Sequence, residues 1–162
     1  MFKSTNPDAA GRIKTKRVAI EGGSYSVKTL PPEKSESFLR ELCNRTNRSL
    51  LTDDTSRFLT TAEFVLDFLA IHPFHDGNGR TARLLSTYLL ERSGYHFARF
   101  YPLDTVILEN RDAYYEALFR AQQRWYREDE DLTPWIEFYT DMVFHQYVRA
   151  FQRVKDAHVR QR

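Results

Sequence analysis

The sequence predicts an all-α fold, a bundle of helices that carries one small β-hairpin. Apolar residues recur at helical spacing in several long segments, and one short segment alternates around a pair of glycines. The length of 162 residues is that of a single domain. We therefore expect a flexible N-terminal arm over residues 1–16 and one domain over residues 17–162.

The hairpin is predicted over residues 17–28, where apolar and polar residues alternate on either side of Gly22 and Gly23. Pro31 and Pro32 close it and start a helix, because proline suits a first helical turn. In that helix Phe38, Leu39, Leu42 and Cys43 are predicted to share one apolar face.

Four further helices are predicted at residues 56–72, 80–94, 110–128 and 132–154. The first is apolar on more than one side and is expected to be central. Its apolar positions are Phe58, Leu59, Ala62, Val65, Leu66 and Leu69. It ends by His72, since a residue before proline is pushed out of the α region. We expect Gly94 to end the second helix, and Asn110 and Thr133 to cap the third and fourth.

Composition excludes several classes of protein. The single cysteine permits no internal disulfide, and the net charge of +2 gives no reason to expect nucleic acid as a partner. No apolar run is long enough to span a membrane. We predict a cytoplasmic protein, with delivery into a host cell by a secretion system left open.

The segment 72–83, HPFHDGNGRTAR, concentrates charge between two apolar helices. Gly77 and Gly79 let a ligand approach the main chain at a helix N-terminus, where the N–H groups favour an anion. Arg80 and Arg83 share a helix face and suit the oxygens of an oligophosphate. Asp76 could hold the Mg²⁺ that accompanies a nucleoside polyphosphate.

His72 is the remaining titratable group and a candidate general base. It follows a helix C-terminus, which would stabilise the proton that the ring accepts. Residue chemistry alone therefore predicts a phosphate site with a metal ion and a base.

Three other interpretations of the segment stay open at this point. It could be a tight helix connection with surface charge. The string GNGRTA satisfies the dinucleotide fingerprint, but a helix precedes it instead of the required strand. His72, His75 and Asp76 could be ligands in a metal-dependent phosphohydrolase, which would need further acids and histidines from other helices.

The segment also resembles the signature of the Fic family, H-P-F-x-[D/E]-G-N-G-R-x-x-R, with every fixed position present. The resemblance covers roughly residues 11–145. It includes IEGGSYSVKTLPPEK, which looks like the family's hairpin flap, and the downstream segments ENRDAYYEAL and LTPWIEFY. It implies a Fic-type helical bundle with the active-site loop at 72–83.

The resemblance implies transfer of AMP from ATP to a Tyr, Thr or Ser hydroxyl of a target protein, a nucleotidyltransferase reaction. His72 would take the hydroxyl proton, and Asp76 would hold Mg²⁺ between the α- and β-phosphates. Gly77, Asn78 and Gly79 would form the anion hole, with the Asn78 side chain also on phosphate. Arg80 and Arg83 would hold the β- and γ-phosphates. These roles meet the needs of an in-line displacement.

The residue type at position 79 separates subfamilies. Doc-like members, which phosphorylate, carry Lys where this chain has Gly79, so glycine favours AMP transfer. Donors of UMP or phosphocholine remain open, as does a non-catalytic interaction module. The flap would pair its edge with a target segment; the docking residues are Ile20, Glu21, Gly22, Gly23, Ser24 and Tyr25.

Regulation is the least determined feature. The string TVILEN at 105–110 matches the inhibitory pattern [S/T]-x-x-x-E-[G/N], whose glutamate pairs with the second motif arginine, here Arg83. Because the string directly adjoins the next motif, we expect no inhibitory role for it. A small antitoxin-like inhibitor and a homodimer are the other partners left open.

Overall fold

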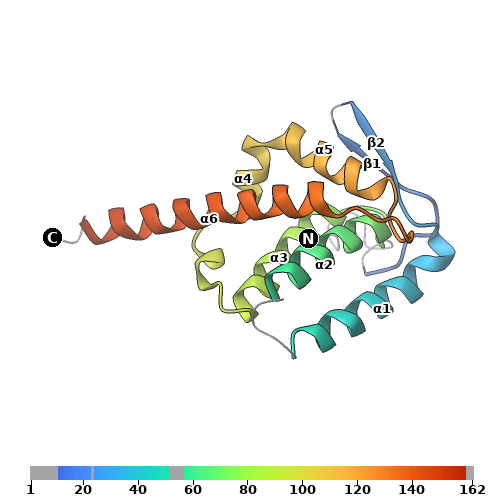
Figure 1. Ribbon diagram of the computed structural model, residues 1–162, viewed down its shortest axis with the longest axis horizontal. Coiled ribbons are helices and arrows are strands. Elements are labelled where there is room, and N and C mark those ends of the chain that lie inside the picture. The colour runs from blue at the N-terminus through green and yellow to red at the C-terminus, as the bar shows by residue number, and fades with distance from the viewer. Residues whose placement is uncertain (1–10, 23, 52–56, 160–162) are drawn as a thin grey trace.

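The structure is a computed structural model, and it describes residues 11–22, 24–51 and 57–159. Six α-helices, one 3₁₀ helix and a two-stranded hairpin make up the described chain (Figure 1). In chain order they are β1 (Ala19–Gly22), β2 (Tyr25–Lys28), α1 (Pro32–Ser49), α2 (Arg57–Ile71), α3 (Asn78–Arg92), η2 (His96–Arg99), α4 (Leu103–Glu109), α5 (Arg111–Gln122) and α6 (Thr133–Val159). The predicted all-α fold with a small hairpin is confirmed.

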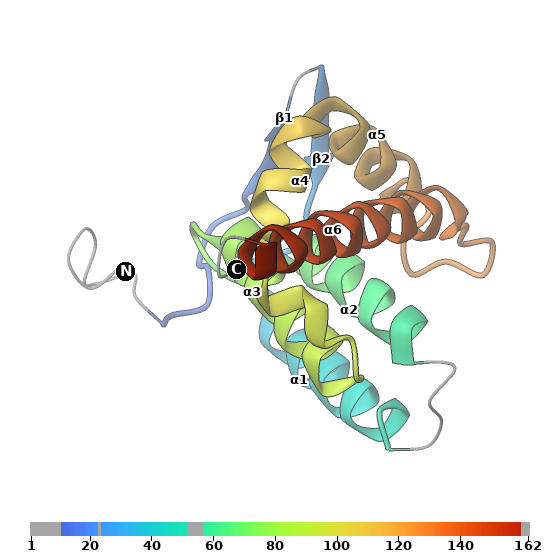
Figure 2. The same cartoon turned by 90° about the vertical axis from the view of Figure 1, so that its left-hand side faces the viewer.

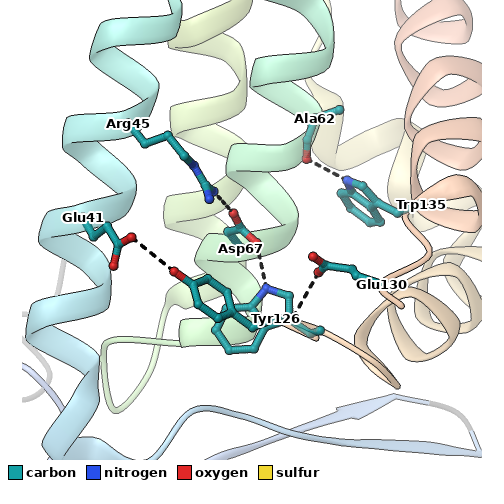
Figure 3. Close-up of polar contacts among 8 residues, drawn as sticks. Glu41, Arg45, Ala62, Asp67, Tyr126, Glu130 and Trp135 are labelled. Atoms are coloured by element: carbon teal, nitrogen blue, oxygen red, sulfur yellow. Dashed lines mark hydrogen bonds and ion pairs between the residues drawn. The ribbon is translucent and has the colours of Figure 1, made fainter. Parts of the chain in front are cut away.

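Helix α2 lies at the centre of the bundle and packs against α1, α3 and α6 (Figures 1 and 2). Its last four residues are all buried, which agrees with the prediction of a central helix. The indole of Trp135 at the start of α6 is fully buried, and its Nε1 donates to the carbonyl oxygen of Ala62 over 2.7 Å (Figure 3). This bond fixes α6 against α2.

The hairpin is antiparallel, with Ala19 paired to Lys28 and Gly22 paired to Tyr25. Ile20 and Val27 are buried on its inner face. Strand β2 packs against α5, so β1 is the outer strand of the described sheet and has one unpaired edge. An unpaired edge can accept another strand.

Residues 11–16 do not form the loose arm that the sequence predicted. Ile13 pairs with Phe74 in an isolated antiparallel bridge, and Lys14 N donates to the carbonyl oxygen of Pro73 over 2.8 Å. Thr15 N donates to the imidazole Nε2 of His75 over 3.1 Å. This segment therefore belongs to the folded domain; the rest of the predicted arm, residues 1–10, lies outside the described residues.

Two predicted apolar positions are in fact exposed, Cys43 in α1 and Leu59 in α2. Both lie one position away from the stripe that packs on the neighbouring helix. Gly94 follows Ser93, the C-cap of α3, in the expected left-handed conformation (φ +91°), and Tyr95 N donates to the Leu90 carbonyl across it.

Helix α5 ends at Gln122, earlier than predicted, and helix α4 was not predicted. Asn110 occupies the N-cap position of α5, but its amide Nδ2 donates back to the Val106 carbonyl of α4 over 2.9 Å. Thr133 is the first residue of α6, and its N–H donates to the Asp131 carboxylate over 3.0 Å. The capping hydrogen bond at the start of α6 is therefore made by the Asp131 side chain and not by Thr133, which was the predicted cap.

The connection between α5 and α6 is held by a polar cluster shown in Figure 3. The Asp67 carboxylate forms an ion pair with Arg45 of α1 and accepts a 2.7 Å hydrogen bond from Trp125 Nε1. The hydroxyl of Tyr126 donates to Glu41 of α1 over 3.2 Å. Burial raises the pKa of Asp67 despite these partners. The cluster ties the connection to α1 and α2.

Candidate active site

The site begins at the C-terminal end of α2, where the last carbonyls need partners from outside the helix. The ammonium of Lys14, which is 2% exposed, donates to the Ile71 carbonyl over 2.8 Å and to Thr29 Oγ1 over 3.0 Å. Leu30 N donates to the Ala70 carbonyl over 2.9 Å. The N-terminal segment and the end of the hairpin thus fix the position of the residue directly after α2.

That residue is His72, held in a left-handed conformation (φ +50°) that is uncommon for a residue other than glycine. Its ring Nδ1 lies 3.2 Å from the Leu69 carbonyl. A carbonyl can only accept, so Nδ1 carries the proton in the neutral ring and Nε2 carries the lone pair.

The helix end favours the protonated ring as expected, through the Leu69 carbonyl, but burial outweighs this effect. Burial lowers the pKa of His72 to about 4, and the charge of Lys14 also lowers it. The bond to Leu69 and the charge of Asp76 raise it, but these effects are outweighed. The ring is therefore neutral at physiological pH, the form in which it can accept a proton.

The loop after His72 is held by the side chain of Asn78. Its Oδ1 accepts from Phe74 N over 2.9 Å and its Nδ2 donates to the Phe74 carbonyl over 2.8 Å. The residue is 1% exposed. Phe74 packs against Phe68 with ring centroids 6.3 Å apart, so it anchors the loop to the apolar core. Both polar atoms of the Asn78 amide are thus engaged with the loop backbone, and its contact with phosphate stays a prediction.

Helix α3 begins directly after this loop. Gly77 is its N-cap with φ +82°, a conformation that favours glycine, so the first N–H groups of α3 point out of the helix. Gly79 lies in the first turn, and a Cβ there would come within 3.1 Å of an Arg83 guanidinium nitrogen. The predicted anion hole is therefore a helix N-terminus with close access to its main chain.

The charged residues of the loop and of α3 are partly accessible. The Asp76 side chain is 75% exposed and lies 3.4 Å from the Arg80 guanidinium. Arg83 is more enclosed, and its Nε forms an ion pair with Asp104 of α4. Sequence reasoning missed Asp104.

These groups line one cavity of about 370 Å³. Its walls come from β1, the loop, the start of α3, and Tyr114 and Tyr115 of α5. The lining includes His72, Asp76, Gly77, Asn78, Gly79, Arg80 and Arg83. The structure thus brings together all seven residues predicted for the base, metal and phosphate roles.

The flap residues separate into two groups. Glu21 and Ser24 are exposed, and Ile20 and Glu21 line the cavity. Gly22 is buried against the Tyr115 ring so closely that a Cβ would overlap it. Tyr25 packs on Phe119 of α5 with ring centroids 5.2 Å apart. Gly22 and Tyr25 therefore attach the flap to α5, and Gly23 lies outside the described residues.

The candidate inhibitory glutamate does not reach the site. Glu109 lies 3.4 Å from Arg149 of α6, and the acidic partner of Arg83 is Asp104.

The described residues do not contain a group of three or more His, Cys, Asp or Glu side chains that could hold a metal ion. A metal-dependent phosphohydrolase needs such a group.

None of the helices described is both long and apolar enough to cross a bilayer.

Lys14 and Asp104 are the site neighbours that the sequence did not predict. Lys14 lies 57 residues before the carbonyl it contacts, in a polar stretch with no periodic pattern. Asp104 belongs to a helix of seven residues, which is too short to show clear periodicity.

Comparison with known proteins agrees with this geometry. A profile of the Fic/DOC family matches residues 1–90. Protein adenylyltransferase fic-1 of Caenorhabditis elegans is 30% identical over 157 residues, which is 94% of this chain and 27% of that protein. The chain therefore spans about a quarter of the length of this curated relative.

Two solved structures share the fold. A Fic family protein from Desulfovibrio desulfuricans aligns with a TM-score of 0.71 and 27% identity, over 93% of this chain and 43% of its own. Fic-1 from Caenorhabditis elegans aligns with a TM-score of 0.70 and 28% identity, over 96% of this chain and 41% of its own. With more than half of its length matched by the family profile and its signature loop folded around a single cavity, the chain belongs to the Fic/DOC family.

Proposed function

We propose that this chain is a protein adenylyltransferase, which transfers AMP from ATP to a hydroxyl group of a target protein. One observation carries the proposal. A neutral imidazole, an exposed carboxylate, a helix N-terminus and two arginines line the same cavity of about 370 Å³. These are a base, a metal ligand and an anion site, the parts that nucleotidyl transfer needs.

His72 acts as the general base. Its Nε2 accepts the proton of the target hydroxyl as the oxygen attacks the α-phosphorus, and the bond to pyrophosphate breaks. The Leu69 carbonyl holds the ring in the tautomer that leaves Nε2 free to accept. A pKa of about 4 makes the apo ring a weak base, and the negative charge of bound triphosphate raises that pKa toward the working range.

The start of α3 binds the phosphates. The N–H groups that follow Gly77 stabilise negative charge on the α-phosphate as it develops. Arg80 and Arg83 neutralise the departing pyrophosphate. Arg83 must first exchange Asp104 for phosphate, so the ion pair between them competes with ATP.

Asp76 is suited to hold Mg²⁺ together with the substrate. Magnesium sites that act on nucleotides use one or two carboxylates and complete their shell with phosphate oxygens and water. The Asp76 carboxylate is 75% exposed in the cavity, which fits that donor set. The ion would neutralise phosphate charge, while Asp76 fixes its place beside the start of α3.

The outer edge of β1 receives the target. It lines the cavity from Val18 to Glu21, so a segment paired along it would present its side chain to His72. Main-chain pairing demands little of the target sequence. Tyr, Thr and Ser hydroxyls are all compatible with this arrangement.

Labelled nucleotides test the proposal. Relative to the lysate alone, we expect addition of this chain to increase protein labelling from ATP that carries the isotope at the α-phosphate and not from ATP that carries it at the γ-phosphate. His72→Ala should abolish labelling while calorimetry shows ATP–Mg²⁺ binding retained, and His145→Ala, an exposed histidine on α6, should change neither. Transfer of the γ-label would show a kinase, transfer from UTP another donor, and no ATP binding at all a non-catalytic module.

A further inference from the structure

The C-terminal half of α6 extends past the other elements (Figure 1). Beyond Ala150, the last residue of α6 that is buried on the body, every residue to Val159 is exposed. Four apolar side chains follow one line along α6, from the segment before Ala150 into the segment after it: Phe144, Tyr147, Phe151 and Val154, each 46–61% exposed. We call these four residues the α6 stripe.

The spacing of the α6 stripe is three, four and three residues. This is the a/d pattern with which one helix packs along another in a coiled coil. The face that holds α6 on the domain is formed by Val143, Gln146 and Ala150. Tyr147 lies at the border of the two faces, because one side of its ring contacts the Phe97 ring with centroids 5.2 Å apart. The stripe is therefore a second packing surface, turned about a quarter of the way around the helix.

We propose that the α6 stripe pairs with the α6 stripe of a second copy of this chain, in an antiparallel two-helix dimer. In antiparallel pairing, a positions of one helix face d positions of the other. Phe144 then packs against the partner's Val154, and Tyr147 packs against the partner's Phe151. The two-fold axis repeats both contacts, as an isologous interface requires.

Charge selects this orientation. Asp141 and Lys155 are exposed, lie two heptads apart and flank the stripe on the same side. In the antiparallel register Asp141 lies beside the partner's Lys155, and the symmetry gives the pair twice. In a parallel dimer the two copies of each of these residues would lie on opposite sides of the interface, so Asp141 and Lys155 would not pair. Val148 lies between the two flanking charges and adds apolar area at the axis.

The interface is small. Four partly exposed apolar side chains from each copy cover roughly 1,000 Å² in total, which is near the lower limit of specific interfaces. We therefore expect a reversible dimer with a dissociation constant in the micromolar range.

Sedimentation equilibrium of the 162-residue chain at about 5–300 µM tests the proposal. The wild type should pass from monomer to dimer in this range. Phe151→Asp should remain monomeric, because it places a charge in the apolar layer. Leu51→Asp removes an apolar side chain that is 80% exposed outside α6 and should dimerise as the wild type does. Circular dichroism and thermal melts check that each variant is folded.

A charge swap tests the orientation. Asp141→Lys should weaken the dimer about fivefold, since it faces the partner's Lys155. Adding Lys155→Asp to that variant should restore the wild-type constant. A monomeric wild type, a dimer that survives Phe151→Asp, or binding of the stripe to anionic vesicles in place of self-association would each overturn the proposal. None of these outcomes depends on catalysis.

Discussion

Lys14→Met probes the contact between the N-terminal segment and the end of α2. The substitution keeps the length of the side chain and removes the donor to Ile71 and Thr29, at 2.8 and 3.0 Å. Two hydrogen bonds contribute about 1 kcal/mol each, so the variant should be about 2 kcal/mol less stable above pH 10.5, where the Lys14 amine is uncharged in the folded and the unfolded chain. For a chain of this size that lowers Tm by roughly 4–8 °C.

The difference in stability between the wild type and Lys14→Met should depend on pH. Burial, together with the charge of Arg17, lowers the pKa of Lys14 from 10.5 to about 8. Between these values the folded chain loses the proton while the unfolded chain keeps it, so the stability of the wild type rises with pH. The uncharged amine still donates both hydrogen bonds. The gap between wild type and Lys14→Met should therefore widen from pH 7 to pH 9.

Urea unfolding at several pH values measures the gap, and Lys16→Met is the control. Lys16 lies in the same segment with an exposed side chain, and its removal should change stability by less than about 0.5 kcal/mol. NMR titration should also find a higher His72 pKa in Lys14→Met, because a neighbouring positive charge is lost. A difference in stability that stays constant or narrows as the pH rises would refute the reasoning.

Three further substitutions test other contacts of the site. Gly22→Ala should lower the free energy of unfolding by about 1–3 kcal/mol, because the added methyl group overlaps the Tyr115 ring. Thermal unfolding and limited proteolysis of the hairpin measure the effect, and wild-type stability with wild-type protection would contradict the contact. Asp104→Asn should tighten ATP binding about two- to fivefold in calorimetry, since Arg83 loses a competing partner. An unchanged dissociation constant for ATP would mean that the ion pair does not compete. Asn78→Ala should lower the free energy of unfolding by about 2–4 kcal/mol in urea, because two loop backbone groups lose their hydrogen-bond partners. A loss under about 0.5 kcal/mol would mean that the Asn78 amide does not hold the loop.

The signature loop was predictable because its residues act locally. Gly77, Arg80 and Arg83 lie within one turn or two of a helix start, so their spacing alone places them on one side of the cavity. The central helix and the hairpin were likewise predicted from periodicity. Local pattern was enough wherever the relevant partners were close in sequence.

The remaining features depend on partners far along the chain. The low pKa of His72 was not predicted, because the helix-end effect is visible in the sequence, while burial of the ring is a property of the packed fold. The amide of Asn78 looked available until the loop folded back on it. Leu59 and Cys43 matched helical spacing but missed the contact face by one position.

The bridge between Ile13 and Phe74 also bears on how the protein folds. Contacts across about sixty residues close a large loop, which costs chain entropy before any native interaction repays it. Helices can form early from neighbouring residues, but the turn at His72 depends on contacts with the segment around Lys14, so we expect it to reach its final geometry later. Activity should accordingly return later than helix content when unfolded protein is diluted out of denaturant.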